Sequence, residues 1–225
     1  MFELSLIHIF TDAKKNLRDS ILYATDPDSH DVVLIFNGQV IAGTRAKKVK
    51  TYSFDAFKSI NFPFLAQIQE NRIIRYLPPE KPLEHLKFHP CLNPKVFLLK
   101  LTPGISPQLL DSIFRIYDCI IIESFGVGGI PLSIADTLRS LKQQYTQEEK
   151  ILVLTTQVTY EGSHSDVYEV GRRYQHHLRF LEAHDMTLEA VYTKMMWIMS
   201  HENLSYEEIK RLFYTSINFD TVYKQ

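Results

Sequence analysis

The second half of the chain alternates apolar runs of strand length with segments of helical periodicity, and this pattern restricts the fold most. Strands apolar throughout are typical of a parallel sheet that is covered on both faces, and parallel strands need long crossovers. We therefore predict an α/β domain built on a buried parallel sheet. The predicted strands are residues 96–101, 119–124 and 151–155, and the helices between them are residues 106–117 and 131–144.

Helical periodicity continues to the C-terminus, whereas the first third of the chain is rich in strand signals. Asn37-Gly38 is the strongest short signal for a tight hairpin, and it is flanked by apolar runs. The further predicted helices are residues 167–183, 187–200 and 205–216. In the first third we predict a helix at residues 16–23, a fully buried strand at 32–36, a strand at 39–42 and a weak strand pair that includes 73–76.

A proline-rich stretch separates these two regions. Residues 78–94 hold five of the ten prolines. Proline fixes φ and removes a backbone donor, so we interpret this stretch as an extended linker. It is the predicted boundary between a domain at residues 11–77 and a domain at residues 95–225.

Charge and hydropathy exclude several classes of partner. The formal net charge is −1, and the nearest approach to a basic block, residues 45–50, is short and is predicted to lie in a turn, which argues against nucleic-acid binding. No apolar stretch approaches the roughly 20 residues of a membrane span. Residues 1–10 have neither the basic start nor the cleavage site of a signal peptide. We predict a soluble protein with a small-molecule or protein partner.

The two cysteines indicate a reducing, cytoplasmic compartment, because two in 225 residues do not make a disulfide framework. Cys119 begins an apolar run and is predicted to be a buried, inert thiol. Cys91 completes a His85-x-x-x-His89-x-Cys91 pattern. The pattern falls in the proline-rich stretch and has no fourth ligand nearby, so we do not interpret it as a zinc site.

Ligands of open α/β sheets bind beyond the carboxyl ends of the strands, which draws attention to Gly126-x-Gly128-Gly129. The spacing is neither G-x-G-x-x-G nor that of a P-loop, and Pro131 removes an amide that a phosphate cradle would use. A tight strand-to-helix turn is the favoured interpretation. A small-molecule contact is the first alternative, and nucleotide binding is the second.

The next predicted strand is followed by Ser163-His164-Ser165-Asp166, which are the residue types of a hydrolytic triad. Sequence neighbours do not readily take up nucleophile–base–orienter geometry, which normally draws on distant segments. We interpret these residues as a polar loop.

Lys48 is a candidate on chemical grounds, because it follows the predicted hairpin and lies near other basic residues. A lysine that is partly desolvated beside other cations can serve as a base. From composition alone, a solvated surface lysine is the better interpretation. The residues by themselves predict a two-domain α/β protein with an unspecified small-molecule site.

A series of motifs from about Thr11 to the C-terminus resembles type I-like, cytoplasmic bacterial L-asparaginases, whereas residues 1–10 do not match the family pattern. In the C-terminal half the motifs are V-L-T-T-Q-V at 153–158, Y-E-V-G at 168–171, D-M-T-L-E-A at 185–190, T-K-M-M-W at 193–197, and the interdomain turn I-E-S-F-G-V-G-G-I-P at 122–131. In the N-terminal part they are T-D-A at 11–13, N-L-R-D at 16–19, F-N-G at 36–38, G-x-R-A-x-K at 43–48 and D-A-F-x-S-x-N at 55–61.

The resemblance implies an incomplete larger α/β domain followed by a smaller flavodoxin-like parallel-sheet domain, assembled as a homodimer or a dimer of dimers. It implies hydrolysis of L-asparagine to L-aspartate and ammonia through a threonine nucleophile and an acyl-enzyme, without a cofactor or metal. A second threonine, an aspartate and a lysine handle protons in such enzymes. The lysine of the G-x-R-A-x-K motif corresponds to Lys48, which is therefore the predicted catalytic residue.

The departures from the family pattern are specific. The T-G-G-T and G-T-D motifs, which carry both threonines and the aspartate, do not occur in this chain, so we expect an N-terminally truncated member without its nucleophile. Lys47 and Glu123 replace the threonine and arginine of allosterically regulated members, which argues against an effector site. The alternatives are a non-catalytic module for dimerisation or small-ligand binding, and part of a tRNA-linked amidotransferase. Neither nucleic acid nor membrane is an expected partner of the chain itself.

Overall fold

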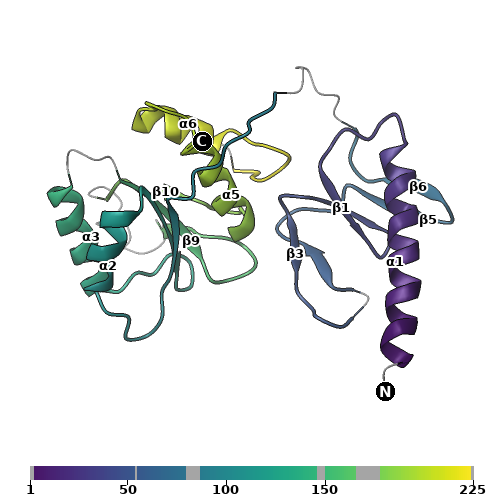
Figure 1. Cartoon of the computed structure of the whole chain (residues 1–225), viewed down its shortest axis with the longest axis horizontal. Helices are drawn as coiled ribbons and strands as arrows, with labels where there is room; N and C mark the ends of the chain where they lie inside the picture. Colours follow the sequence, from purple (N-terminus) through teal and green to yellow (C-terminus); the bar gives the residue numbers. More distant parts are fainter. Residues whose placement is uncertain (1–2, 54, 80–86, 146–149, 166–177, 224–225) are drawn as a thin grey trace. The chain divides into compact units, whose positions relative to one another are not determined.

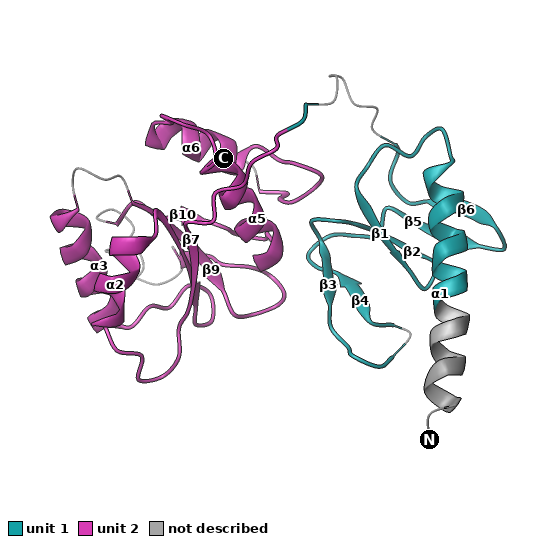
Figure 2. Cartoon of the chain, viewed as in Figure 1, with its two compact units in different colours: residues 1–88 teal, residues 89–225 magenta. Residues whose placement is uncertain are grey.

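The computed structural model of the chain describes residues 3–53, 55–79, 87–145, 150–165 and 178–223. It divides the chain into two units, residues 1–88 and residues 89–225 (Figure 2). Each unit has its own sheets and its own buried side chains. Within the described residues, no helix has the length and apolar character needed to cross a membrane.

The first unit combines a long helix with antiparallel strands (Figure 1). Helix α1 spans Glu3–Ala24 and includes the helix predicted at residues 16–23. One sheet has the order β1-β2-β5-β6, and β3 and β4 form a separate pair. These strands are β1 (Val33–Phe36), β2 (Gln39–Ala42), β3 (Ala46–Lys48), β4 (Phe57–Ser59), β5 (Ala66–Gln69) and β6 (Arg72–Arg75).

The hairpin predicted at Asn37-Gly38 is confirmed, and it joins β1 to β2 in antiparallel register. Both turn residues have positive φ, 51° for Asn37 and 75° for Gly38, as a two-residue hairpin turn requires. A Cβ at Gly38 would lie 2.8 Å from the Ile68 carbonyl oxygen, so glycine is also needed for close approach. The weak strand pair is confirmed as β5 and β6.

Two predictions for this unit are wrong. Strand β1 is not fully buried: all its residues are partly exposed and the preceding Val32 is 75% exposed, because β1 is an edge strand. Residues 45–50 are not simply a turn, since Ala46–Lys48 forms β3 and pairs with β4. Backbone pairing of such short polar strands leaves no hydrophobic periodicity in the sequence.

The second unit contains the predicted parallel sheet, in the order β10-β9-β8-β7, which fits a flavodoxin-like domain. The predicted crossover helices and the two helices after residue 187 are also confirmed (Figure 1). The strands are β7 (Val96–Lys100), β8 (Cys119–Ser124), β9 (Ile151–Thr156) and β10 (Leu181–Glu182). The helices are α2 (Leu109–Ile116), α3 (Leu132–Gln144), α5 (Leu188–Ile198) and α6 (Tyr206–Tyr214).

Alternate side chains of the central strands supply two separate cores, one on each face of the sheet. On one face Cys119, Ile121, Ile151 and Val153 pack with residues of α5 and α6. On the other face Ile120, Ile122, Leu152 and Leu154 pack with residues of α2 and α3. Cys119 is buried, as predicted, and its burial raises the pKa of the thiol.

The predicted helix at residues 167–183 is wrong at its end, and residues 166–177 lie outside the described residues. Leu181 and Glu182 form strand β10 and pair in parallel with Val153 and Leu154 of β9. This long-range pairing overrides the local helical pattern. The segment therefore brings Glu182 to the carboxyl edge of the sheet.

Candidate functional site

The carboxyl ends of the parallel strands are joined by three short segments, which together we call the strand-end platform. It consists of the turn at residues 125–129 after β8, residues 156–157 at the end of β9, and the loop at residues 162–165. Because this edge of an open α/β sheet is where ligands bind, the platform is the candidate site of the second unit.

The turn at residues 125–129 is closed by its own backbone. The amides of Gly128 and Gly129 donate to the Phe125 carbonyl at 3.1 and 2.7 Å, and the Phe125 amide donates back to Gly129 at 3.0 Å. Gly128 has φ of +138°, and a Cβ there would lie 3.2 Å from Cα and Cβ of Ser165. The glycine pattern therefore forms a tight strand-to-helix turn, and the two amides it uses internally are not available to a phosphate.

Thr156 and Gln157 tie the ends of three strands together. The Thr156 hydroxyl donates to the carbonyl of Gly126 and accepts from the amide of Val158 at 3.0 Å. The Gln157 side-chain amide donates to the carbonyls of Leu101 at 2.6 Å and Glu123 at 3.0 Å. One amide side chain therefore joins the end of β8 to the residue that follows β7.

Ser163, His164 and Ser165 form a polar loop, as predicted, and Asp166 lies outside the described residues. The His164 amide donates to the Val127 carbonyl at 2.8 Å, and the Ser163 amide donates to the His184 carbonyl at 3.0 Å. The Ser165 hydroxyl donates to Glu182 at 2.7 Å rather than to a histidine. The loop thus contacts the turn through the backbone, and its described residues do not assemble a triad.

Glu182 and His184 lie beside the loop at residues 162–165 and are not predicted from the sequence, because Glu182 falls in the predicted helix at 167–183 and His184 directly follows it. Glu182 is 5% exposed, and its carboxylate accepts from the amide and the hydroxyl of Ser165. His184 is 9% exposed and stacks on Tyr223 with ring centroids 3.6 Å apart. Burial lowers the pKa of His184, although the nearby charge of Glu182 acts in the opposite direction.

Two buried polar atoms beside the platform have no hydrogen-bond partner among the residues that the structure describes. They are Oγ of Ser163 and Nδ1 of His184. Buried polar groups are normally paired with protein or with ordered water.

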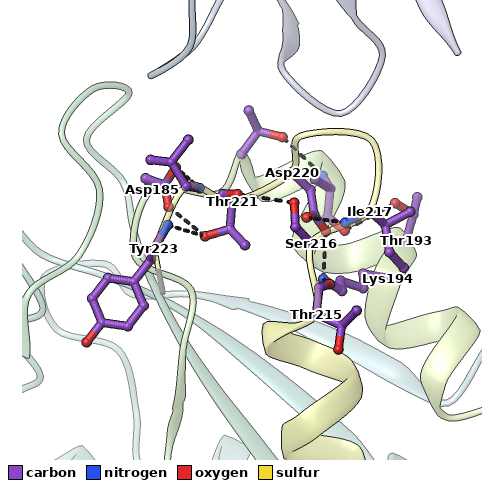
Figure 3. Close-up of polar contacts among 12 residues, drawn as sticks. Asp185, Thr193, Lys194, Thr215, Ser216, Ile217, Asp220, Thr221 and Tyr223 are labelled. Carbon is purple, nitrogen blue, oxygen red and sulfur yellow. Dashed lines mark hydrogen bonds and ion pairs between the residues drawn. The ribbon is translucent and has the colours of Figure 1, made fainter. Parts of the chain in front are cut away.

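The C-terminal segment is fastened to α5 and to the residue after His184 (Figure 3). Nζ of Lys194 lies 2.7 Å from the Asp220 carboxylate and 2.7 Å from the Thr215 carbonyl. Asp185 accepts from the Thr221 hydroxyl at 2.8 Å and from the Val222 amide at 3.0 Å. Burial lowers the pKa of Lys194, and the hydrogen bond with Asp220 opposes that shift.

Lys48, the predicted catalytic residue, lies in the first unit at the end of β3, opposite Phe57 of β4. Its side chain is exposed, and within the described part of the chain it makes no hydrogen bond or ion pair. Asp55 pairs instead with Lys58 at 2.7 Å and with Lys50 at 3.5 Å. The hydrogen bond from Lys58 is the main cause of the lowered pKa of Asp55. The structure thus leaves the Lys48 side chain exposed, and the Asp55 carboxylate is engaged by two other lysines.

The histidine–cysteine pattern does not form a metal centre in the described residues. His89 packs against the rings of Trp197 and His201, with centroids 5.7 and 5.4 Å away, Cys91 is exposed, and His85 lies outside the described residues. No group of three or more potential ligands with a metal-site arrangement occurs among the residues that are described.

Residues 95–213 match the family described as Glutaminase/Asparaginase C-terminal domain, and residues 3–81 match Asparaginase, N-terminal. The chain belongs to the glutaminase/asparaginase family. An L-asparaginase of Thermococcus kodakarensis is 36% identical over 208 residues, which are 92% of this chain and 62% of that protein. The D-subunit of a glutamyl-tRNA(Gln) amidotransferase from Pyrococcus abyssi is 29% identical, and the match covers 92% of this chain and 48% of the relative.

Solved structures of this family share the fold. The thermostable L-asparaginase from T. kodakarensis superposes with a TM-score of 0.86 and 32% identity, covering 95% of this chain and 63% of its own. L-asparaginase I from Vibrio cholerae has a TM-score of 0.71 and 25% identity, covering 85% of this chain and 57% of its own. The chain therefore spans less than two thirds of the length of each of these relatives.

Proposed function

We propose that this chain provides part of an amidohydrolase site that converts L-asparagine and water to L-aspartate and ammonia. The similarity to an L-asparaginase along 92% of the chain carries this proposal, because it includes the motif in which Lys48 lies. In the proposed reaction a threonine hydroxyl attacks the carboxamide carbon, the C–N bond breaks with release of ammonia, and water hydrolyses the acyl-enzyme. No cofactor is needed for these steps.

Lys48 is the proposed proton-handling residue of this site. Its exposed position on β3 supports the role, since a cation that is not engaged by a neighbouring carboxylate can approach a second group in an assembled site. The threonine nucleophile, the second threonine and the aspartate are not represented by T-G-G-T or G-T-D in these 225 residues. We propose that a segment carrying those motifs completes the site.

The test is ammonia release from L-asparagine by the chain joined to the part of the T. kodakarensis L-asparaginase that the match does not cover. Lys48→Ala should lower turnover by roughly 100-fold or more, as expected for loss of a general acid–base group. Lys50→Ala is the matched control, because Lys50 is exposed and close to Lys48 but pairs with Asp55. Turnover in Lys48→Ala equal to that of the control would refute the role of Lys48.

A related amidotransferase is the second candidate, because the D-subunits of glutamyl-tRNA(Gln) amidotransferases from several archaea match most of the chain at 26–30% identity. The two functions differ in their requirement for a partner. Ammonia release from L-asparagine without tRNA favours the asparaginase. Release that appears only with a glutamyl-tRNA and a further amidotransferase protein favours the amidotransferase.

The assembly and compartment are also proposals. We propose that the chain assembles as a homodimer or a dimer of dimers. We also propose a reducing, cytoplasmic environment, which is supported by the two free cysteines, one buried and one exposed. Size-exclusion chromatography with light scattering tests the assembly. A stable monomer that binds no amino acid would weaken both the enzymatic proposal and the alternative of a dimerisation or ligand-binding module.

A further inference from the structure

We propose that Glu182 is the positioning residue of the strand-end platform: through Ser165 it fixes the turn at residues 125–129. None of the hydrogen bonds described above joins Glu182 to the turn. Its effect on the position of the turn therefore passes through the loop at residues 162–165. The relevance of this arrangement to a ligand rests on the proposed function. The positioning itself can be tested without it.

The carboxylate of Glu182 has a defined acceptor role. Its two oxygens accept separately from Ser165, Oε1 from the amide at 2.8 Å and Oε2 from the hydroxyl at 2.7 Å. Both residues are buried, with 5% exposure for Glu182 and 2% for Ser165. Two hydrogen bonds to the two oxygens of one carboxylate fix both the position and the rotation of Ser165.

Ser165 and its neighbour transmit this position to the turn. The main chain and Cβ of Ser165 approach Gly128 so closely that a Cβ on Gly128 would lie 3.2 Å from them. The amide of His164 donates to the carbonyl of Val127 at 2.8 Å. A displacement of the loop would therefore move both central residues of the turn.

The edge of the sheet explains why a side chain that makes two hydrogen bonds is needed at this place. Strand β10 has only two residues, which pair with Val153 and Leu154 of β9. So short a strand offers little backbone pairing to hold the loop beside it. Burying a charged group is costly unless its hydrogen bonds are satisfied, and an apolar residue would fill the same volume without holding Ser165. The two bonds to Ser165 add to the backbone hydrogen bond between this loop and the segment after β10, from the Ser163 amide to the His184 carbonyl.

Amide hydrogen exchange of the full 225-residue chain, followed by NMR, tests the proposal. Glu182→Ala should accelerate exchange at His164, Ser165 and Gly128 by roughly tenfold or more, because both hydrogen bonds from Ser165 to this side chain are lost. Exchange at Ile121 and Val153 in the central strands should not change. Glu182→Gln should restore slow exchange, since its carbonyl oxygen accepts from the Ser165 amide and its NH₂ donates to the Ser165 hydroxyl.

Two further variants keep the test decisive. Ser165→Ala removes only the hydroxyl contact and should accelerate exchange at the same amides by a smaller factor, even where Glu182→Ala folds poorly. Glu202→Ala removes an exposed carboxylate between α5 and α6 and should change none of these rates. The proposal would be overturned if both Glu182→Ala and Ser165→Ala exchanged these amides at wild-type rates. It would also be overturned if exchange in the central strands accelerated by the same factor as exchange in the turn and the loop. Failure of asparagine turnover would refute only the proposed function.

Discussion

At position 162 the backbone leaves room for glycine alone. Gly162 has φ of +79°, and a Cβ built on it would lie 2.0 Å from the His184 carbonyl oxygen. We predict that Gly162→Ala lowers the free energy of unfolding by at least about 2 kcal/mol, from strain and from backbone displacement together. Urea denaturation measures this loss.

Gly104→Ala is the matched control for Gly162→Ala. Gly104 also has φ of +79°, but a Cβ there would meet nothing within 4 Å. Gly104→Ala should therefore lower the free energy of unfolding only through conformational strain, by about 1 kcal/mol. Equal losses for the two variants would show that the close approach of Gly162 to His184 does not contribute.

His184 makes stability depend on pH. Burial lowers its folded pKa below the ordinary value of 6.5, although Glu182 and Asp185 oppose the shift and His164 adds to it. As pH falls below 6.5, the unfolded chain therefore takes up a proton that the folded chain resists, and folding is weakened. The contribution of neutral, buried His184 to stability is complete above pH 6.5 and is lost as pH falls through the lowered pKa. We predict a greater loss of stability between pH 7.5 and 5.5 for the wild type than for His184→Gln. Equal losses in urea titrations would contradict this.

At the scale of elements, a buried ion pair attaches the C-terminal segment to α5. The side chains of Lys194 and Asp220 are 4% and 2% exposed and lie 2.7 Å apart. Asp220→Ala leaves a buried cation without its partner and should cost about 3–5 kcal/mol of unfolding free energy. The double variant Lys194→Met/Asp220→Leu should recover much of that loss, because no buried charge remains.

A surface pair provides the control for this measurement. Asp136 and Arg139 lie 3.1 Å apart on α3, and their side chains are about half exposed, at 54% and 46%. Asp136→Ala should cost less than about 1 kcal/mol. If Asp220→Ala costs no more than the surface variant, the attachment of the C-terminal segment does not depend on the buried pair.

The elements that could be predicted are those with a complete local signature. Strand β8 is predicted with the bounds that the structure gives, because its first four residues, 119–122, form an apolar run that is buried on both faces of the sheet. The Asn37-Gly38 hairpin was predicted because positive φ at two adjacent residues needs those residue types. Strand β10 was missed, since two residues have no periodicity of their own.

The candidate site, too, could be predicted only where its residues form a local sequence pattern. The turn at residues 125–129 was predicted from its glycines, and Lys48 was singled out from its motif. The contacts of Glu182 with Ser165 and of Gln157 with Leu101 join segments that are 17 and 56 residues apart. Such contacts follow from the parallel pairing of strands, which only the fold reveals. The catalytic role of Lys48 stays a prediction.

At the scale of the whole molecule, the second unit has what an independent domain needs. Its sheet is covered by helices on both faces and carries two apolar cores. We predict that residues 89–225 alone unfold in one cooperative transition, measured by circular dichroism and by tryptophan fluorescence from Trp197. Noncoincident transitions from the two probes would contradict independent folding.

The most direct test of the central claim is ammonia release from L-asparagine by the 225-residue chain, alone and joined to the part of the T. kodakarensis relative that the match does not cover. Circular dichroism of both proteins establishes that each is folded. We predict no turnover above the uncatalysed rate for the chain alone and clear turnover for the joined protein. Robust turnover by the chain alone would contradict the claim that its nucleophile lies outside these residues. A folded joined protein without turnover would contradict the proposed asparaginase site.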